Sequence, residues 1–197
     1  MTEIAEKDIS KEEENYELTD NKVVLPDKDS GKFIELRQIK AIKDIREDIF
    51  GEVIAREGTL GGFIQSKGNL NSESGASAWI ERDVLVYGNT RIINGIVRRS
   101  VLNGNITIDG SSLIVGANVE VNEGSIYIKG STIHGENGNI KIVSTGSLTI
   151  EDVRITNSGD EALKIIGKGN INPRHHFEKA KTSEKSSVNE LKESERT

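Results

Sequence analysis

Short runs in which apolar and polar residues alternate fill residues 73–172 of the chain. Each run places two apolar side chains on one face and a polar one on the other, which is the two-residue period of a half-buried β-strand. Gly, Asn, Ser and Asp fill the gaps between runs, and these residues tolerate the backbone of tight corners. The pattern predicts short strands at 106–108, 119–121, 126–128, 140–142 and 148–150.

The spacing of these runs predicts how the strands are arranged. Successive runs start about six to eight residues apart, which is closer than the ~8–12-residue spacing of an antiparallel meander. Strands this short bury an apolar face when the chain coils and stacks equivalent strands into ladders. At ~18–22 residues per coil, about five coils would form. We therefore predict an all-β fold, a single-stranded parallel β-helix or β-solenoid.

The repeat length bears on the hand of this helix. Every sixth residue over 78–114 is, with few exceptions, small or β-branched, as in the hexapeptide repeats of left-handed β-helices. Downstream the step lengthens to seven or eight residues. A left-handed helix is favoured for the early coils, and the hand of residues 115–170 stays open.

The segments on either side of the solenoid differ from it and from each other. Residues 1–15 hold six acidic residues and two lysines, and we expect a disordered acidic leader. Residues 16–72 would form a β-rich capping module, because the first coil of a solenoid exposes an unpaired edge and an open core. Within the cap, Gly58, Gly61 and Gly62 are expected in tight turns. Residues 173–197 form a charged tail, predicted to be disordered or partly helical.

Composition narrows the classes of function. The net charge of −6 gives no field that would attract a polyanion, so general nucleic-acid binding is disfavoured. There is no cysteine and no apolar stretch long enough to span a bilayer. The acidic N-terminus does not match a secretory signal. We expect a cytoplasmic protein that needs no membrane and no cofactor.

Four segments carry a resemblance to a known family. They are YELTD (16–20), FIELRQIKAIKDI (33–45), GTLGGFIQSKGNLNSESGASAWI (58–80) and RDVLVYGNT (82–90). In this order they resemble a family of bacterial and prophage-encoded solenoid proteins, in which a short N-terminal module precedes hexapeptide-like β-helix coils. Some members are labelled transferases because acyltransferases share the repeat. The resemblance implies the fold and an origin in a prophage or mobile element, but fold-level analogy is weak support for an activity.

Two residues are candidates for catalysis. His134 could be the general base of a trimeric hexapeptide-type acyltransferase, although a surface corner is the preferred interpretation. Asp160 could serve a carbohydrate-active β-helix, but such an enzyme needs a second carboxylate, for which Glu151 and Asp152 are the nearby candidates. A turn is the preferred interpretation here. His175 and His176 are adjacent and make a poor chelating pair, so no metal site is expected.

The favoured function is that of a non-enzymatic scaffold or binding protein, because a solenoid presents flat and regular faces to partners. We expect a protein partner, self-association, or both. One version is a phage counter-defence protein that docks on a host immune complex. The candidate contact residues form a basic cluster in the early coils, partly neutralised by neighbouring acids, although scattered solvated charges are the preferred interpretation: Arg82, Arg91, Arg98 and Arg99.

Overall fold

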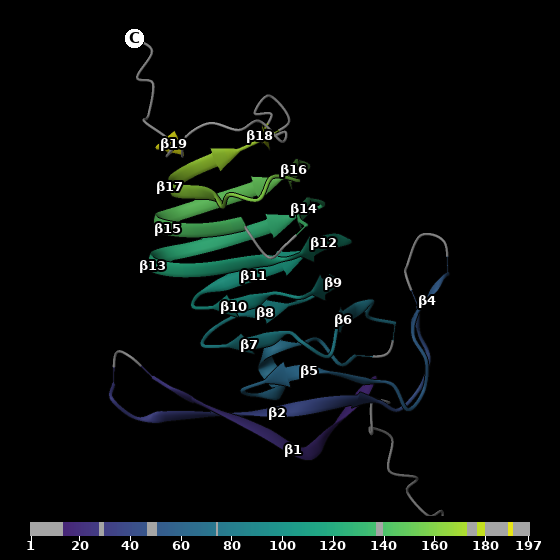
Figure 1. The fold of residues 1–197 in the computed structure, drawn as a ribbon. Coiled ribbons are helices and arrows are strands. Elements are labelled where there is room, and N and C mark those ends of the chain that lie inside the picture. Colours follow the sequence, from purple (N-terminus) through teal and green to yellow (C-terminus); the bar gives the residue numbers. More distant parts are fainter. Residues whose placement is uncertain are drawn as a thin grey trace, which may run out of the picture.

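A computed structural model describes residues 14–27, 30–46, 51–73, 75–136 and 140–172, together with the backbone of two short strands at 177–179 and 189–190. The molecule is all-β, a parallel β-solenoid of about five turns with a hairpin module at one end (Figure 1). The predicted fold class is confirmed. Most of the predicted leader, residues 1–13, lies outside the described residues, and the hand of the early coils stays a prediction.

The N-terminal module is a hairpin that joins the solenoid through a shared sheet. β1 (Tyr16–Pro26) and β2 (Phe33–Ala41) pair in antiparallel fashion, and β2 pairs in the same way with β5 (Leu60–Ile64). β5 then pairs in parallel with β7 (Leu85–Tyr87). The change from antiparallel to parallel pairing therefore takes place across β5, so no open edge separates the hairpin module from the first coil.

Two smaller elements lie beside this module. β3 (Ile45–Arg46) and β4 (Val53–Ala55) form an antiparallel arm that projects beside the solenoid (Figure 1). The 3-10 helix η1 (Lys67–Asn69) precedes Leu70, which forms a parallel bridge with Ile92. Parallel pairing thus begins before residue 73, where the solenoid was predicted to start.

Three stacks of strands form the walls of the solenoid. The first continues the sheet of the cap through β7, β10 (Val101–Asn103) and the first halves of β13 (Ala117–Lys129), β15 (Ile140–Glu151) and β17 (Leu163–Ile171). The second runs through β8 (Arg91–Ile92), β11 (Ile106–Asp109) and the second halves of those long strands. The third is a separate sheet of β6 (Ala78–Ile80), β9 (Gly95–Arg98), β12 (Ser112–Val115), β14 (Thr132–Gly135), β16 (Arg154–Asn157) and β18 (Phe177–Lys179).

The core consists of three columns of apolar side chains, one from each stack. Parallel register places each side chain directly above the equivalent one in the previous coil, so every coil closes the core left open by the one below. Burying a branched side chain of this size contributes about 1.5–3 kcal/mol. The columns are Ile64–Val86–Leu102–Val119–Ile142–Ile165, Ile92–Ile108–Ile128–Ile150–Ile171 and Ile80–Val97–Ile114–Ile133–Ile155, all almost fully buried.

The coils lengthen along the solenoid. Leu85 pairs with Val101, 16 residues later, whereas Ala117 pairs with Ile140, 23 residues later. In the long coils the runs at 119–121 and 126–128 lie within the single strand β13, where two separate strands were predicted. A register shift between Val121 and Glu123 absorbs the corner, so the backbone stays paired with β15 through the bend.

Two of the predicted turn glycines were assigned wrongly. Gly58 does adopt a left-handed φ of 81°, but Gly61 and Gly62 lie within β5. A Cβ on Gly61 would come within 2.7 Å of the Ile80 carbonyl oxygen, and one on Gly62 within 2.5 Å of the Val84 carbonyl oxygen. These two glycines are needed because neighbouring backbone passes close to β5, not because the chain turns there.

The charged tail also departs from the prediction where it is described. β18 pairs in parallel with β16, and β19 (Asn189–Glu190) pairs in parallel with β17. Both extend existing ladders as strands, where disorder or helix was predicted. The remaining residues of this tail lie outside the described part. No described helix has the length and apolar character needed to cross a membrane.

Candidate binding surface

The outer face of the third stack carries a groove that brings the arm and the solenoid together. Ile96 of β9 and Leu113 of β12 are register partners and half-buried, and Ile54 of β4 approaches them from the arm. The groove has a volume of about 200 Å³. Its lining is completed by Ser77, Gly95, Arg98, Ser111 and Ser112. The result is a small apolar floor with hydroxyl groups and one guanidinium at its rim, which we call the arm groove.

Arg98 stands at the rim of the arm groove at the end of β9. Its Nε lies 2.9 Å from Oε1 of Glu81, and both side chains are more than two-fifths exposed. An exposed pair of this kind contributes at most about 1 kcal/mol to stability. The Arg98 guanidinium is therefore exposed at the surface and only weakly restrained by Glu81.

Arg99 is fixed by its backbone as well as its side chain. It adopts a left-handed φ of 45°, and its N–H donates to Oδ1 of Asp83 at 3.2 Å. Its guanidinium donates from Nη1 to the carbonyl oxygen of Glu136 at 3.3 Å. Arg99 thus links the corner of its own coil to the end of β14.

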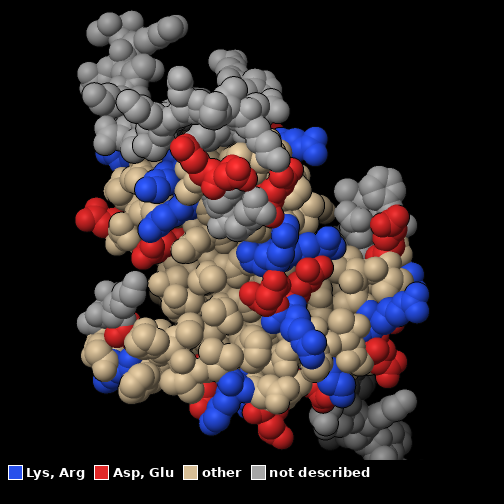
Figure 2. Space-filling model, viewed as in Figure 1, with Lys and Arg blue, Asp and Glu red and all other residues tan. Residues whose placement is uncertain are grey.

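The four predicted contact arginines do not share one face. Arg82, Arg98 and Arg99 lie at the same corner of consecutive coils, where Glu81 and Asp83 also lie. Arg91 belongs to β8 in the second stack, where it pairs with Thr107 of β11. On the flank visible in Figure 2, basic and acidic side chains lie next to one another, without a continuous basic stripe.

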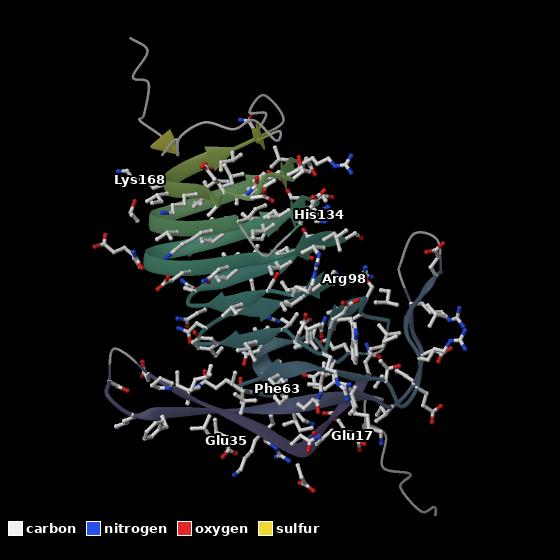
Figure 3. The ribbon with its side chains drawn as sticks, viewed as in Figure 1. Glu17, Glu35, Phe63, Arg98, His134 and Lys168 are labelled. Atoms are coloured by element: carbon white, nitrogen blue, oxygen red, sulfur yellow. The ribbon has the colours of Figure 1, made fainter. Side chains whose placement is uncertain are left out.

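His134 lies on the same flank as Arg98 (Figure 3). Register places it two rungs away, with Val115 between them, so the two side chains are about 10 Å apart along the ladder. His134 is half-buried within β14, not at the surface corner that the sequence suggested. Its neighbour on the other side is Thr156. Neither of these register partners, Val115 and Thr156, supplies a carboxylate that could orient the imidazole as a general base.

Asp160 is exposed in the turn between β16 and β17. Asn157 organises this turn: its Nδ2 donates to the Glu161 carbonyl oxygen at 2.8 Å, and its Oδ1 accepts from the Gly159 N–H at 3.2 Å. Asp152 lies at the other end of β16. Glu151 lies 3.3 Å from Nζ of Lys129 on the first sheet. The carboxylates that a glycosidase would need close together are therefore separated by a strand.

Within the described part of the chain, no three His, Cys, Asp or Glu side chains gather in a way that could hold a metal ion. His175 and His176 lie outside it.

Sequence reasoning missed the hydrophobic part of the surface. Ile96 appeared only as a position in the six-residue repeat, and the arm was not predicted as a separate element. Alternation within GIVR (95–98) does signal that Ile96 faces outward, because Val97 faces the core. Nothing in the sequence places Ile54 next to it.

Comparison with known proteins does not assign this chain to a family. No protein-family model matches the chain. No curated protein matches it either.

Proposed function

We propose that this chain is a non-enzymatic β-solenoid scaffold that acts by binding another protein through the arm groove. The observation that supports the proposal is the combination of half-buried Ile96 and Leu113 with exposed Arg98 on one rigid sheet face. Protein interfaces typically join an apolar centre to a polar rim, and arginine is enriched in them. The resemblance of residues 16–110 to prophage-encoded solenoids supports an origin in a prophage or mobile element, as part of the same proposal.

The counter-defence role is the specific form of this proposal. The partner that the arm groove would fit is a host immune complex that presents a carboxylate beside an apolar side chain. Arg98 can exchange Glu81 for a partner carboxylate, while Leu113 on the groove floor packs against an apolar side chain that the partner inserts into the arm groove. The rigid ladder positions both groups before contact, which lowers the entropic cost of binding.

Affinity capture with matched variants tests this proposal. The full chain, Leu113→Glu and Thr149→Glu are each used to retain proteins from a lysate of a bacterial host. Thr149 is a half-buried, outward-facing strand residue of the first sheet, so it controls for adding an acidic group to a strand. We expect one host protein retained by the wild type and by Thr149→Glu, and lost with Leu113→Glu. Equal retention by all three would contradict the role of the arm groove.

Direct titration with acyl-coenzyme A separates the proposal from the acyltransferase alternative. The scaffold is expected to give no heat of binding. Saturable binding that His134→Ala abolishes in a defined trimer would support the enzyme instead.

A further inference from the structure

The outer edge of β1 lacks a partner among the described strands. β1 begins the order of the first sheet, and β2 occupies its other side. From Lys22 to Pro26 the pairing with β2 is continuous, because the register shift lies between Leu18 and Lys22. This half of β1 therefore offers a straight, regular backbone edge at the end of the hairpin that extends beyond the solenoid (Figure 1).

The hydrogen bonds of the hairpin fix which backbone groups face outward. The Asp27 N–H donates to the Lys32 carbonyl oxygen at 2.8 Å, so the backbone of Asp27 faces β2. Backbone groups alternate along a strand, and Leu25 and Val23 therefore face β2 as well. It follows that Lys22 and Val24 direct both N–H and C=O to the open edge. Pro26 directs only its carbonyl there, since proline has no N–H.

An apolar patch lies along the same edge. Phe33 is 77% exposed and Val24 is 52% exposed, the highest values among the large apolar side chains described. Phe33 pairs with Pro26, two residues from Val24, so all three side chains project from one face of the hairpin. Lys22, the charge on this stretch, is already paired with Glu35 at 2.9 Å. Lys22 and Pro26, residue types that usually protect edge strands from pairing, stand at the two ends of this stretch, and the apolar residues 23–25 lie between them.

The geometry points to pairing of this edge with the same edge of a second copy of the chain. Two copies of residues 22–26 pair in antiparallel fashion about a twofold axis at Val24. Val24 of each copy then donates to and accepts from Val24 of the other. The Lys22 N–H of each copy donates to the Pro26 carbonyl oxygen of the other. Proline has no N–H, so the second hydrogen bond of this pair, from Pro26 to the Lys22 carbonyl oxygen, is not formed.

The side chains along this edge are also compatible with self-pairing. In this register Lys22 lies opposite Pro26 of the second copy, so like charges do not face each other across the new interface. The Val24 and Phe33 side chains of both copies form one continuous apolar surface on a four-stranded antiparallel sheet. The edge is thus self-complementary in hydrogen bonding, in charge and in apolar contact, as a twofold interface requires.

Solution mass is the first test. Light scattering after size exclusion of the full chain should give twice the 21.6 kDa of one chain at high concentration. Val24→Pro removes the outward N–H, which is not used in the pairing of β1 with β2, and should raise the dimer dissociation constant by about thirty-fold. Val53→Ser, which trims an exposed apolar residue on the arm, should leave the dissociation constant unchanged. A monomer at every concentration, or a trimer, would overturn the proposal.

A cysteine test decides the register and does not depend on the proline variant folding. The chain has no cysteine, so Val24→Cys introduces a single thiol. Hydrogen-bonded antiparallel partners have Cα atoms about 5.5 Å apart, which lies within disulfide range. Under mild oxidation Val24→Cys should form a covalent dimer much faster than Val53→Cys. Equal rates would overturn the proposed register, and a mixed disulfide with a different protein alone would identify the occupant as another chain.

Discussion

The phenolic oxygen of Tyr16 donates a 2.9 Å hydrogen bond to the carbonyl oxygen of Leu70, and both residues are buried. Tyr16 begins the hairpin, whereas Leu70 bridges Ile92 in the ladder of the solenoid. Asn15 reinforces the junction, since its Nδ2 donates to the carbonyl oxygens of Glu73 and Ala76. The start of the hairpin is therefore attached to the first coil by side chains that satisfy backbone carbonyls.

Tyr16→Phe should destabilise the folded chain by about 1–2 kcal/mol. The substitution keeps the buried ring and removes the hydroxyl, which donates to the carbonyl oxygens of Leu70 at 2.9 Å and Lys67 at 3.3 Å. Urea unfolding followed by circular dichroism measures the difference. Tyr127→Phe is the matched control, because Tyr127 is only half-buried on the outer face of β13. Loss of its hydroxyl should change the free energy of unfolding by less than about 0.5 kcal/mol. Equal effects of the two variants would contradict the role given to the Tyr16 hydroxyl.

The same tyrosine should make stability fall in alkaline solution. Burial, with a smaller contribution from the Glu14 carboxylate, raises the pKa of Tyr16 well above its ordinary value. Above about pH 10 the unfolded chain loses the phenolic proton while the folded chain keeps it, so the unfolded state is favoured. Tyr16 then contributes a slope of at most about −1.4 kcal/mol per pH unit. Between pH 9 and 11 the free energy of unfolding should fall less steeply with pH for Tyr16→Phe than for wild type. Equal slopes for the two proteins would refute this assignment.

Gly62→Ala should prevent correct closure of the first coil. The added Cβ would lie 2.5 Å from the Val84 carbonyl oxygen and 2.6 Å from that of Glu81, both of them backbone atoms that cannot move alone. We expect a loss of at least about 3 kcal/mol or failure to fold. Gly68→Ala is the control, since its nearest atom is the Ser66 hydroxyl at 3.5 Å and its φ is not left-handed. Thermal melting of the two variants compares them directly, and similar melting temperatures would refute the close approach.

The sequence predicted the interior better than the surface, and the reason is the range of the interactions. Ile106 and Ile108 alternate with Thr107 in a single run, and this local pattern alone indicates which side chains enter the core. Gly62 differs, because its requirement comes from the backbone of Glu81 and Val84 in the next coil. The residues around Gly62 in the sequence do not predict how closely that backbone approaches.

The candidate surface depends on contacts that are still more distant in sequence. Ile54 and Leu113 line one groove although they belong to different modules. Arg91 and Arg98 are close in sequence yet belong to different stacks, because a corner of the coil lies between them. These positions depend on the number of residues in each coil, which varies along the chain. The six-residue period of the early coils therefore could not predict them.

Asn69 provides a final test of how the cap region is held. It is buried, its Nδ2 donates to the carbonyl oxygens of Thr90 at 2.7 Å and Gly88 at 3.1 Å, and its Oδ1 accepts from the Ser66 N–H at 2.8 Å. Asn69→Ala leaves these backbone groups unsatisfied and should cost about 2–3 kcal/mol. Asn69→Asp keeps the shape but places a carboxylate against two carbonyl oxygens, so it should cost more than Asn69→Ala at neutral pH.

The two Asn69 variants should respond differently to acid. Burial beside carbonyl oxygens raises the pKa of a carboxyl group at position 69 above its value in the unfolded chain. The folded Asn69→Asp variant then binds a proton more readily than the unfolded one, so its stability relative to Asn69→Ala should rise as the pH falls toward about 4. The protonated carboxyl can donate one hydrogen bond in place of the amide. Parallel pH profiles of the two variants in urea unfolding would show that position 69 does not face the carbonyls of Thr90 and Gly88.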